Sequence, residues 1–155
     1  MDDIAQKRAN ERLCEGAILG DVADVQSALA AGAQIDSRDG YDATPLHWAV
    51  ASRNPTLVRL LLDRGAGLQA RDCYLNTPLH WAVAEGDIAI VGLLSERGST
   101  LTARNRSEET PTALAARLGR TEVVDLLERD AAKQQGHAGR IDDERKDKGP
   151  RQPGG

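Results

Sequence analysis

The segment TPLHWAV occurs twice in this chain, at residues 44–50 and again, letter for letter, at residues 77–83. Aligning residues 39–71 with residues 72–104 gives identity at 18 of 33 positions. Self-similarity at a fixed period of this length is typical of repeat proteins, in which each unit is one small piece of structure. The sequence therefore predicts consecutive units of the same design.

Two more divergent units flank this pair. One period further on lies Thr110-Pro111, and one period back lies Glu11, shortly before Leu13. The predicted units cover approximately residues 8–38, 39–71, 72–104 and 105–134. We expect them to form one domain, residues 1–134, followed by a charged tail over residues 135–155. The tail has almost no large apolar residue and is expected to be disordered, although the fourth unit lacks a stop glycine and its last helix could run into the tail.

Each unit is predicted to be a pair of short helices. Thr44 is a good N-cap, and Pro45 is pre-set for the first helical turn. Asn54-Pro55 ends the first helix and begins the second, and Gly65 ends the second. The apolar positions recur at helical spacing, at Leu46, Ala49 and Val50 in the first helix and at Leu57, Val58, Leu60, Leu61 and Leu62 in the second.

The composition favours a core of small, closely packed helices. The chain has no Phe and only two Trp and two Tyr, although 40% of its residues are hydrophobic. Helices of two to three turns are too short to be stable alone in water. We therefore expect the pairs to be stabilised by stacking on one another.

The TPLH motif, the V-x-L-L run and the Gly-Ala after the second helix closely resemble the ankyrin repeat. The resemblance covers roughly residues 8–134 and implies an all-α solenoid of four stacked helix–turn–helix units with short β-hairpin loops. It also implies that Thr44/His47 and Thr77/His80 knit each hairpin to its own helix and to the neighbouring unit. The structural repeat motif comprises Thr44, Pro45, Leu46 and His47, and Thr77, Pro78, Leu79 and His80.

The chain departs from the family pattern at several positions. The glycine usual two residues before the Thr is replaced by Asp42, Leu75 and Glu108. Because Leu and Glu disfavour positive φ, the hairpins are expected to differ in shape from the family norm. Ser99 replaces the usual Ala in the third unit, and Thr112-Ala113 replaces Leu-His in the fourth, as in terminal units.

No group of residues in the sequence predicts catalysis or a metal site. His47 and His80 lie in separate units without ligands at metal-binding spacing, so we expect them to be structural. Cys14 is predicted to be a small core residue and Cys73 an exposed hairpin residue, with no disulfide between them. The loop carboxylates without a predicted fixed partner are Asp39, Asp42, Glu108 and Glu109. We expect no enzyme activity, no cofactor and no metal.

Charge and hydropathy limit the class of partner. Residues 1–130 carry 14 Lys and Arg against 20 Asp and Glu, which argues against nucleic acid. No apolar run is long enough for a membrane span, and the first residues do not resemble a signal peptide. We expect a monomer without membrane contact, in the cytoplasm or the nucleus.

Four aromatic residues, Tyr41, Trp48, Tyr74 and Trp81, form two identical pairs one period apart. Each Trp could pack between neighbouring first helices or contact a partner, since Trp and Tyr often dominate interface energies. By the resemblance, hairpin tips and first helices line a groove that binds partners. The residues predicted to bind a partner are Tyr41, Trp48, Ser52, Arg53, Tyr74, Asn76, Trp81, Glu85, Arg106 and Arg117.

These observations favour a non-catalytic adaptor or scaffold that binds a protein or an extended peptide in the groove. The third unit is expected to make the groove acidic there, so the favoured peptide has an apolar anchor and a nearby basic residue. Two alternatives remain open at this stage: a stoichiometric inhibitor of a partner enzyme, similar to ankyrin-type kinase inhibitors, and a structural subunit of a larger complex.

Overall fold

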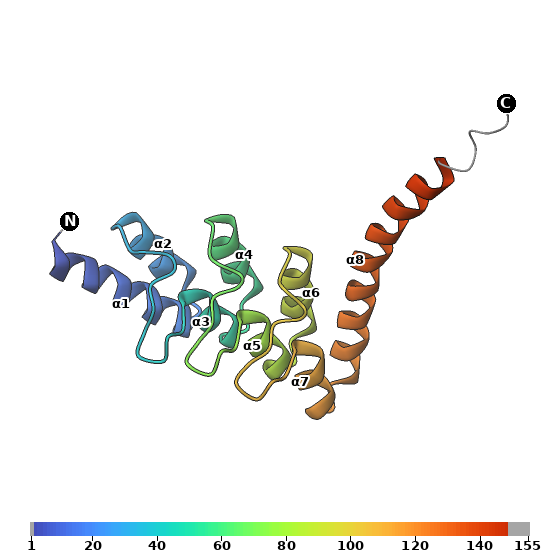
Figure 1. Ribbon diagram of the computed structural model, residues 1–155. Coiled ribbons are helices and arrows are strands. Elements are labelled where there is room, and N and C mark those ends of the chain that lie inside the picture. Colours follow the sequence, from blue (N-terminus) through green and yellow to red (C-terminus); the bar gives the residue numbers. More distant parts are fainter. Residues whose placement is uncertain (1, 149–155) are drawn as a thin grey trace.

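The computed structural model describes the backbone of residues 2–148 and the side chains of residues 2–135. Within these residues the chain forms helices joined by loops, and no segment forms a regular strand. The helices are α1 (Asp3–Leu19), α2 (Val22–Ala30), α3 (Pro45–Ala51), α4 (Pro55–Asp63), α5 (Pro78–Glu85), α6 (Ile88–Glu96), α7 (Pro111–Arg117) and α8 (Thr121–Lys148). They stack as successive pairs, so the predicted all-α solenoid is confirmed (Figure 1).

The helices form two rows. The first row consists of α1, α3, α5 and α7, each packed against the next, and the second row consists of α2, α4, α6 and α8. The loops over residues 31–44, 64–77 and 97–110 return the chain from the second row to the first and extend beyond the first row on one side (Figure 1). The first row and the loops therefore share one face of the molecule.

The helices begin where the capping residues predict. The Thr77 hydroxyl accepts a hydrogen bond from the His80 N–H at 3.4 Å, at the start of α5. In the second row, the side chains of Asn54 and Asp87 accept from backbone N–H groups of their own first turns at 3.2 Å. These side chains satisfy N–H groups that the helix itself leaves without an acceptor.

The core lies between the two rows and runs the length of the stack. Leu46, Ala49 and Val50 of α3 are fully buried, as are Leu57, Val58 and Leu61 of α4. Leu60 and Leu62 are half-buried and pack against the same core. Because each helix pair buries its apolar face on the next pair, the hydrophobic effect stabilises the stack rather than any single unit.

The three inter-unit loops share one shape and keep positive φ at the position where the usual glycine is replaced. Asp42, Leu75 and Glu108 all adopt positive φ, at 58°, 62° and 62°. Each loop closes with the same backbone hydrogen bond, from the N–H of Asp39, Asp72 or Asn105 to the oxygen four residues later, at 3.0 Å in all three. The backbone conformation is thus conserved between units although the glycine is absent.

The reason lies in the side chain that opens each loop. One oxygen of Asp39, Asp72 or Asn105 accepts hydrogen bonds from the two backbone N–H groups two and four residues later, at 2.8 to 3.0 Å. A left-handed residue other than glycine costs about 1–2 kcal/mol. Two hydrogen bonds to one buried or half-buried acceptor offset a cost of that size.

The last helix differs from the expected tail. The sequence predicts disorder from about residue 135 and, as an alternative, a last helix that runs into this segment; the backbone of α8 continues to Lys148. The glycine that ends the corresponding helices of the second and third units is replaced by Ala131, so no left-handed residue stops α8 there. Residues 149–155 lie outside the described residues, and the division into a domain and a tail stays a prediction.

The substitution of Ser99 for alanine predicts a local weakness of the third unit. Ser99 is buried, and its hydroxyl has no hydrogen-bond partner among the described residues. Replacing it with the alanine of the second unit, Ser99→Ala, should raise the free energy of unfolding by about 1 kcal/mol. Urea denaturation measures the change.

Ser95 provides a matched control in the same unit. It is also buried, but its hydroxyl donates to a carboxylate oxygen of Asp130 at 2.6 Å. Ser95→Ala should therefore lower the free energy of unfolding by about 1 kcal/mol or more. Equal effects of the two substitutions would contradict this account of Ser99.

Candidate functional site

Two buried histidines connect neighbouring units. The Nδ1 atom of His47 accepts a hydrogen bond from the Thr44 N–H at 3.1 Å, and its Nε2 atom lies 3.0 Å from the backbone oxygen of Asn76 in the next unit. His80 repeats this arrangement, with its Nε2 atom 2.9 Å from the backbone oxygen of Glu109. Because an oxygen can only accept here, Nε2 carries the proton and donates in both rings.

These contacts require neutral histidines. Burial lowers the pKa of both His47 and His80 below 6.5, and this effect outweighs the backbone oxygens that favour the protonated ring. A proton on Nδ1 would also face the backbone N–H that now donates to it. Both histidines are buried, and each contacts the backbone of the next unit.

Each tryptophan indole is held by an aspartate from the preceding loop. Asp72 uses one oxygen to accept from the N–H groups of Tyr74 and Asn76, and the other to accept from Trp81 Nε1 at 2.8 Å. Asp39 and Trp48 form the same bond one period earlier, at 2.6 Å. Asp39 therefore has fixed partners, and its description as a loop carboxylate without one was wrong.

The indoles also pack on one another. The ring of Trp81 lies edge-to-face against Trp48, with centroids 5.1 Å apart and an interplanar angle of 89°. It also contacts His47, at 5.0 Å and 64°. Both tryptophans are half-buried. The geometry supports the packing role.

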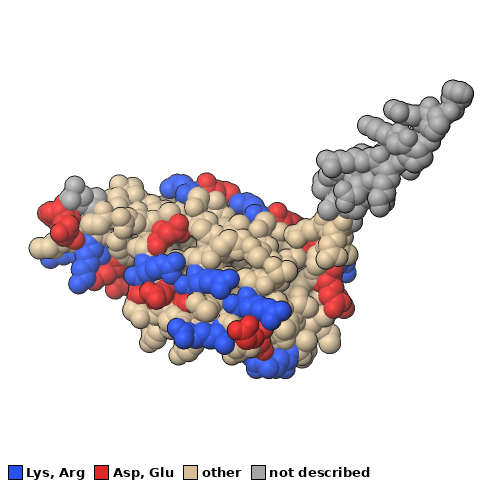
Figure 2. All heavy atoms as spheres, viewed as in Figure 1, with Lys and Arg blue, Asp and Glu red and all other residues tan. Residues whose placement is uncertain are grey.

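Arginines link successive loops. One guanidinium nitrogen of Arg38 donates to the backbone oxygen of Arg71 at 2.6 Å, and Arg71 donates to that of Arg104 at 3.3 Å. Arg106 donates to the backbone oxygen of Cys73 at 2.7 Å. These side chains are exposed, and Figure 2 shows a stepped row of basic side chains across the visible face.

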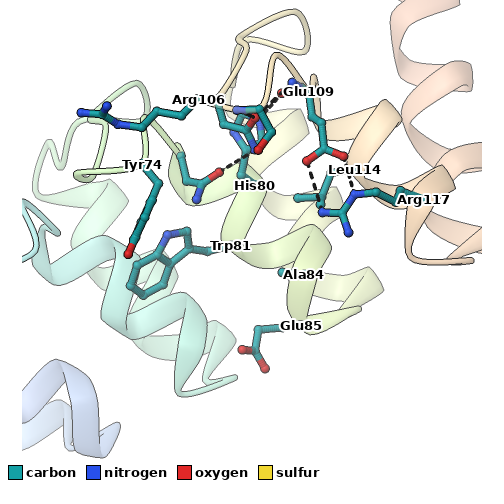
Figure 3. A pocket seen from close by; sticks show the side chains of 12 residues that line it. Tyr74, His80, Trp81, Ala84, Glu85, Arg106, Glu109, Leu114 and Arg117 are labelled. Carbon is teal, nitrogen blue, oxygen red and sulfur yellow. Dashed lines mark hydrogen bonds and ion pairs between the residues drawn. The ribbon is translucent and has the colours of Figure 1, made fainter.

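The first row and the loops enclose a hollow in the third and fourth units, with a volume of about 370 Å³, which we call the C-terminal hollow. In Figure 3, Tyr74 and Trp81 lie on one side of it, and Leu114, Glu109 and Arg117 lie on the other. The lining residues are Tyr74, Asn76, His80, Trp81, Ala84, Glu85, Asn105, Arg106, Ser107, Glu109, Leu114 and Arg117. Its volume lies near the lower end of the range for small-ligand sites, about 300–1,000 Å³.

The hollow gathers six of the ten residues predicted to bind a partner. Those six are Tyr74, Asn76, Trp81, Glu85, Arg106 and Arg117, and the other four are Tyr41, Trp48, Ser52 and Arg53. Trp48 lies directly behind Trp81. The hydroxyl of Ser52 donates to its own helix, at the backbone oxygen of Ala49, 2.7 Å away.

The carboxylates of the hollow are already paired. Arg53 donates to Glu85 at 3.1 Å, and the guanidinium of Arg117 forms two hydrogen bonds with Glu109. The bond from Arg117 holds the pKa of the Glu109 carboxyl below its usual value. The third unit is therefore not a free acidic surface, in contrast to the expectation from the sequence. Glu109 is likewise wrongly described there as lacking a fixed partner.

A second hollow, of about 560 Å³, lies between α1 and the first loop. It includes Cys14, which is half-buried rather than part of the core as expected. Burial, with the charges of Asp39 and Glu15, raises the pKa of the Cys14 thiol to about 11. The thiol therefore stays protonated at neutral pH and is a poor nucleophile.

The chain can now be compared with known proteins. Its features are stacked helix pairs, histidine bonds between units and three loops of one backbone shape. A model of the family described as ankyrin repeats, in three copies, matches residues 13–105. The chain belongs to the ankyrin-repeat family. Ankyrin repeats are generally modules for protein–protein interaction, and enzyme activity is not typical of the family.

Two curated proteins share part of the ankyrin repeats. The chain is similar to an L-asparaginase of Dirofilaria immitis, with 48% identity over 61 residues. It is also similar to the ankyrin repeat, SAM and basic leucine zipper domain-containing protein 1 of Homo sapiens, with 43% identity over 54 residues. These matches cover 39% and 35% of this chain but only 10% and 11% of the two relatives. Matches of this extent bring no whole-protein activity to the chain.

Two further findings concern the part of the ankyrin chain that the structure describes. None of its helices combines the length and the apolar character needed to cross a bilayer. In the same residues, no three His, Cys, Asp or Glu side chains gather closely enough to hold a metal ion.

The histidine contacts predict how stability depends on pH. The unfolded chain takes up protons on His47 and His80 near pH 6.5, whereas the folded chain does so only at lower pH. Above pH 6.5 both states are neutral at these rings, so they add no pH dependence. Below it, the free energy of unfolding should fall, by at most about 1.4 kcal/mol per pH unit for each ring.

Urea denaturation at about pH 7.5 and about pH 5.5 measures this fall. In His47→Gln, the loss between the two pH values should be roughly half that of the unchanged chain, because one of the two rings is gone. A loss of the same size in the variant would contradict the assignment to these rings.

The hydrogen bonds of Asp72 predict that its replacement lowers stability. Asp72→Ala removes three hydrogen bonds, including that to the Trp81 indole, and should lower the free energy of unfolding by about 3 kcal/mol. Asp72→Asn keeps an oxygen for the two backbone bonds, as Asn105 does in the fourth unit, and should cost about 1 kcal/mol. Equal losses in the two variants would show that the loop bonds contribute little.

Proposed function

We propose that this ankyrin-repeat chain is a non-catalytic adaptor that binds an extended peptide segment of a partner protein in the face formed by the first row and the loops. The observation that supports this most directly is the C-terminal hollow. It combines a half-buried indole, an exposed tyrosine and exposed polar backbone and side-chain groups in one concave site. Aromatic residues in a concave site are the usual anchors of a protein interface.

The rigidity of the face adds to this support. Trp81 is fixed by Asp72 and by its contact with Trp48, and the loops are fixed by the arginine bonds between them. A surface that is already ordered loses little conformational entropy when a peptide binds. An extended peptide can follow the loops across more than one unit.

The paired carboxylates change the chemistry of the proposed peptide. Glu85 and Glu109 are engaged by Arg53 and Arg117, so they offer little to a basic residue of the partner. We therefore propose a peptide with an apolar anchor and without a basic residue beside it. We also propose that the chain acts in the cytoplasm or nucleus and is a monomer on its own.

Selection of a random-peptide display library on the immobilised chain tests the function. The selected peptides should bind Tyr74→Ala and Arg106→Gln at least about tenfold more weakly than the unchanged chain. Arg59→Ala, in an exposed position of α4 in the second row, should leave binding unchanged. Titration by fluorescence anisotropy measures the affinities.

Other outcomes would contradict the proposal. Equal weakening by Arg59→Ala would place binding away from the loop face, and a selection without any binder would argue against peptide recognition. If a selected sequence leads to a partner enzyme, loss of that enzyme's activity on addition of the chain would favour an inhibitor over an adaptor.

A further inference from the structure

The C-terminal hollow lies where the column of tryptophans is interrupted. Between the second and third units, the Trp81 ring packs against His47 and Trp48. One period later, the residues that correspond to this pair are His80 and Trp81, and the position of the packing ring is occupied by Leu114. His80, Trp81 and Leu114 all line the hollow (Figure 3).

The hydrogen-bond acceptor for the missing ring has changed as well. Asp72 accepts the Trp81 indole N–H through its second carboxylate oxygen. The corresponding residue of the fourth unit is Asn105, whose second side-chain atom is a nitrogen that donates to the side-chain oxygen of Asn76 at 3.0 Å. The fourth unit therefore differs from the third at both positions, and the smaller Leu114 side chain, itself buried, stands where the third unit has an indole.

Of the charged side chains that line the hollow, Arg106 alone has no ion pair among the described residues. Glu85 and Glu109 are paired with arginines, whereas Arg106 donates to a backbone oxygen and forms no ion pair among the described residues. Arg71 is exposed on the neighbouring loop and likewise has only a backbone acceptor. An acidic residue of a bound peptide would gain a charge-assisted hydrogen bond there.

We propose that the C-terminal hollow holds one aromatic side chain of a partner peptide against the exposed part of Trp81, and that an adjacent acidic residue of the peptide pairs with Arg106. The aromatic side chain would pack on Trp81 as the Trp81 ring packs edge-to-face on Trp48, where the centroids are 5.1 Å apart. Contacts of this kind favour centroid distances of about 4.5–7 Å. The inference rests on the proposed function and names its anchor residue.

A comparison of short peptides on the unchanged chain tests the anchor directly. Acetylated and amidated peptides that share a Gly-Ser frame carry Asp-Trp, Asp-Ala or Lys-Trp at the centre. The Asp-Trp peptide should bind at least about tenfold more tightly than the Asp-Ala peptide, and more tightly than the Lys-Trp peptide. The indole N–H resonance of Trp81 should shift more than that of Trp48, and these are the chain's two tryptophans.

A second test fills the hollow with an indole ring introduced into the fourth unit. The double variant Asn105→Asp with Leu114→Trp gives the fourth unit both residues of the third, and circular dichroism should show it folded. It should bind the Asp-Trp peptide at least about tenfold more weakly than the unchanged chain. The control is Glu15→Trp, which adds the same ring at the same repeat position of the first unit and should leave binding unchanged.

The failure of this inference differs from the failure of the proposed function. Equal binding of the Asp-Trp and Asp-Ala peptides, or full binding by the filled variant, overturns the aromatic anchor. If display still selects peptides whose binding is weakened by Tyr74→Ala, the proposed peptide-binding function stands without the aromatic anchor. If display selects no peptide that depends on the loop face, the proposed function itself fails. The peptide comparison needs no variant, so it decides the question even if the filled chain does not fold.

Discussion

The hydrogen bond from the His47 imidazole to the backbone oxygen of Asn76 fixes how the second and third units are placed on one another. Helices as short as α3 and α5 have little stability alone, so a unit is ordered only when a neighbour covers it. The imidazole fixes its own helix start through Thr44 and the next loop through Asn76, and so couples order within a unit to order between units. The first and fourth described units lack this histidine and have Cys14 and Ala113 at its position.

The fold could be predicted from the sequence because its information is local and repeated. Thr-Pro marks the first helix of a unit, Asn54 or Asp87 marks the second, and the buried leucines follow at helical spacing. Loop shape was not predictable in this way. The positive φ of Leu75 is stabilised by the side chain of Asp72, and a residue considered alone gives no sign of that compensation.

The candidate site could be predicted only in part. The aromatic pairs were visible as periodic residues, and six of the ten residues predicted to bind a partner, from loops and helices, line one hollow. The charges were not predictable, because pairing depends on which long side chains meet across units. Arg53 reaches Glu85 from 32 positions away, and Asp72 reaches an indole nine positions on, at separations that no helical or strand period describes.

The arginine bonds between loops have a consequence for how such a chain can grow. Arg71 donates through its side chain to the next loop and accepts through its backbone oxygen from the previous one, so a single residue carries both halves of the connection. A duplicated segment of one period would contain both the arginine donor and the backbone-oxygen acceptor at the positions needed to bond to its neighbours. Gene duplication within the second and third units could therefore lengthen the molecule without a compensating change elsewhere, and their 18 shared residues are the record expected of such an event.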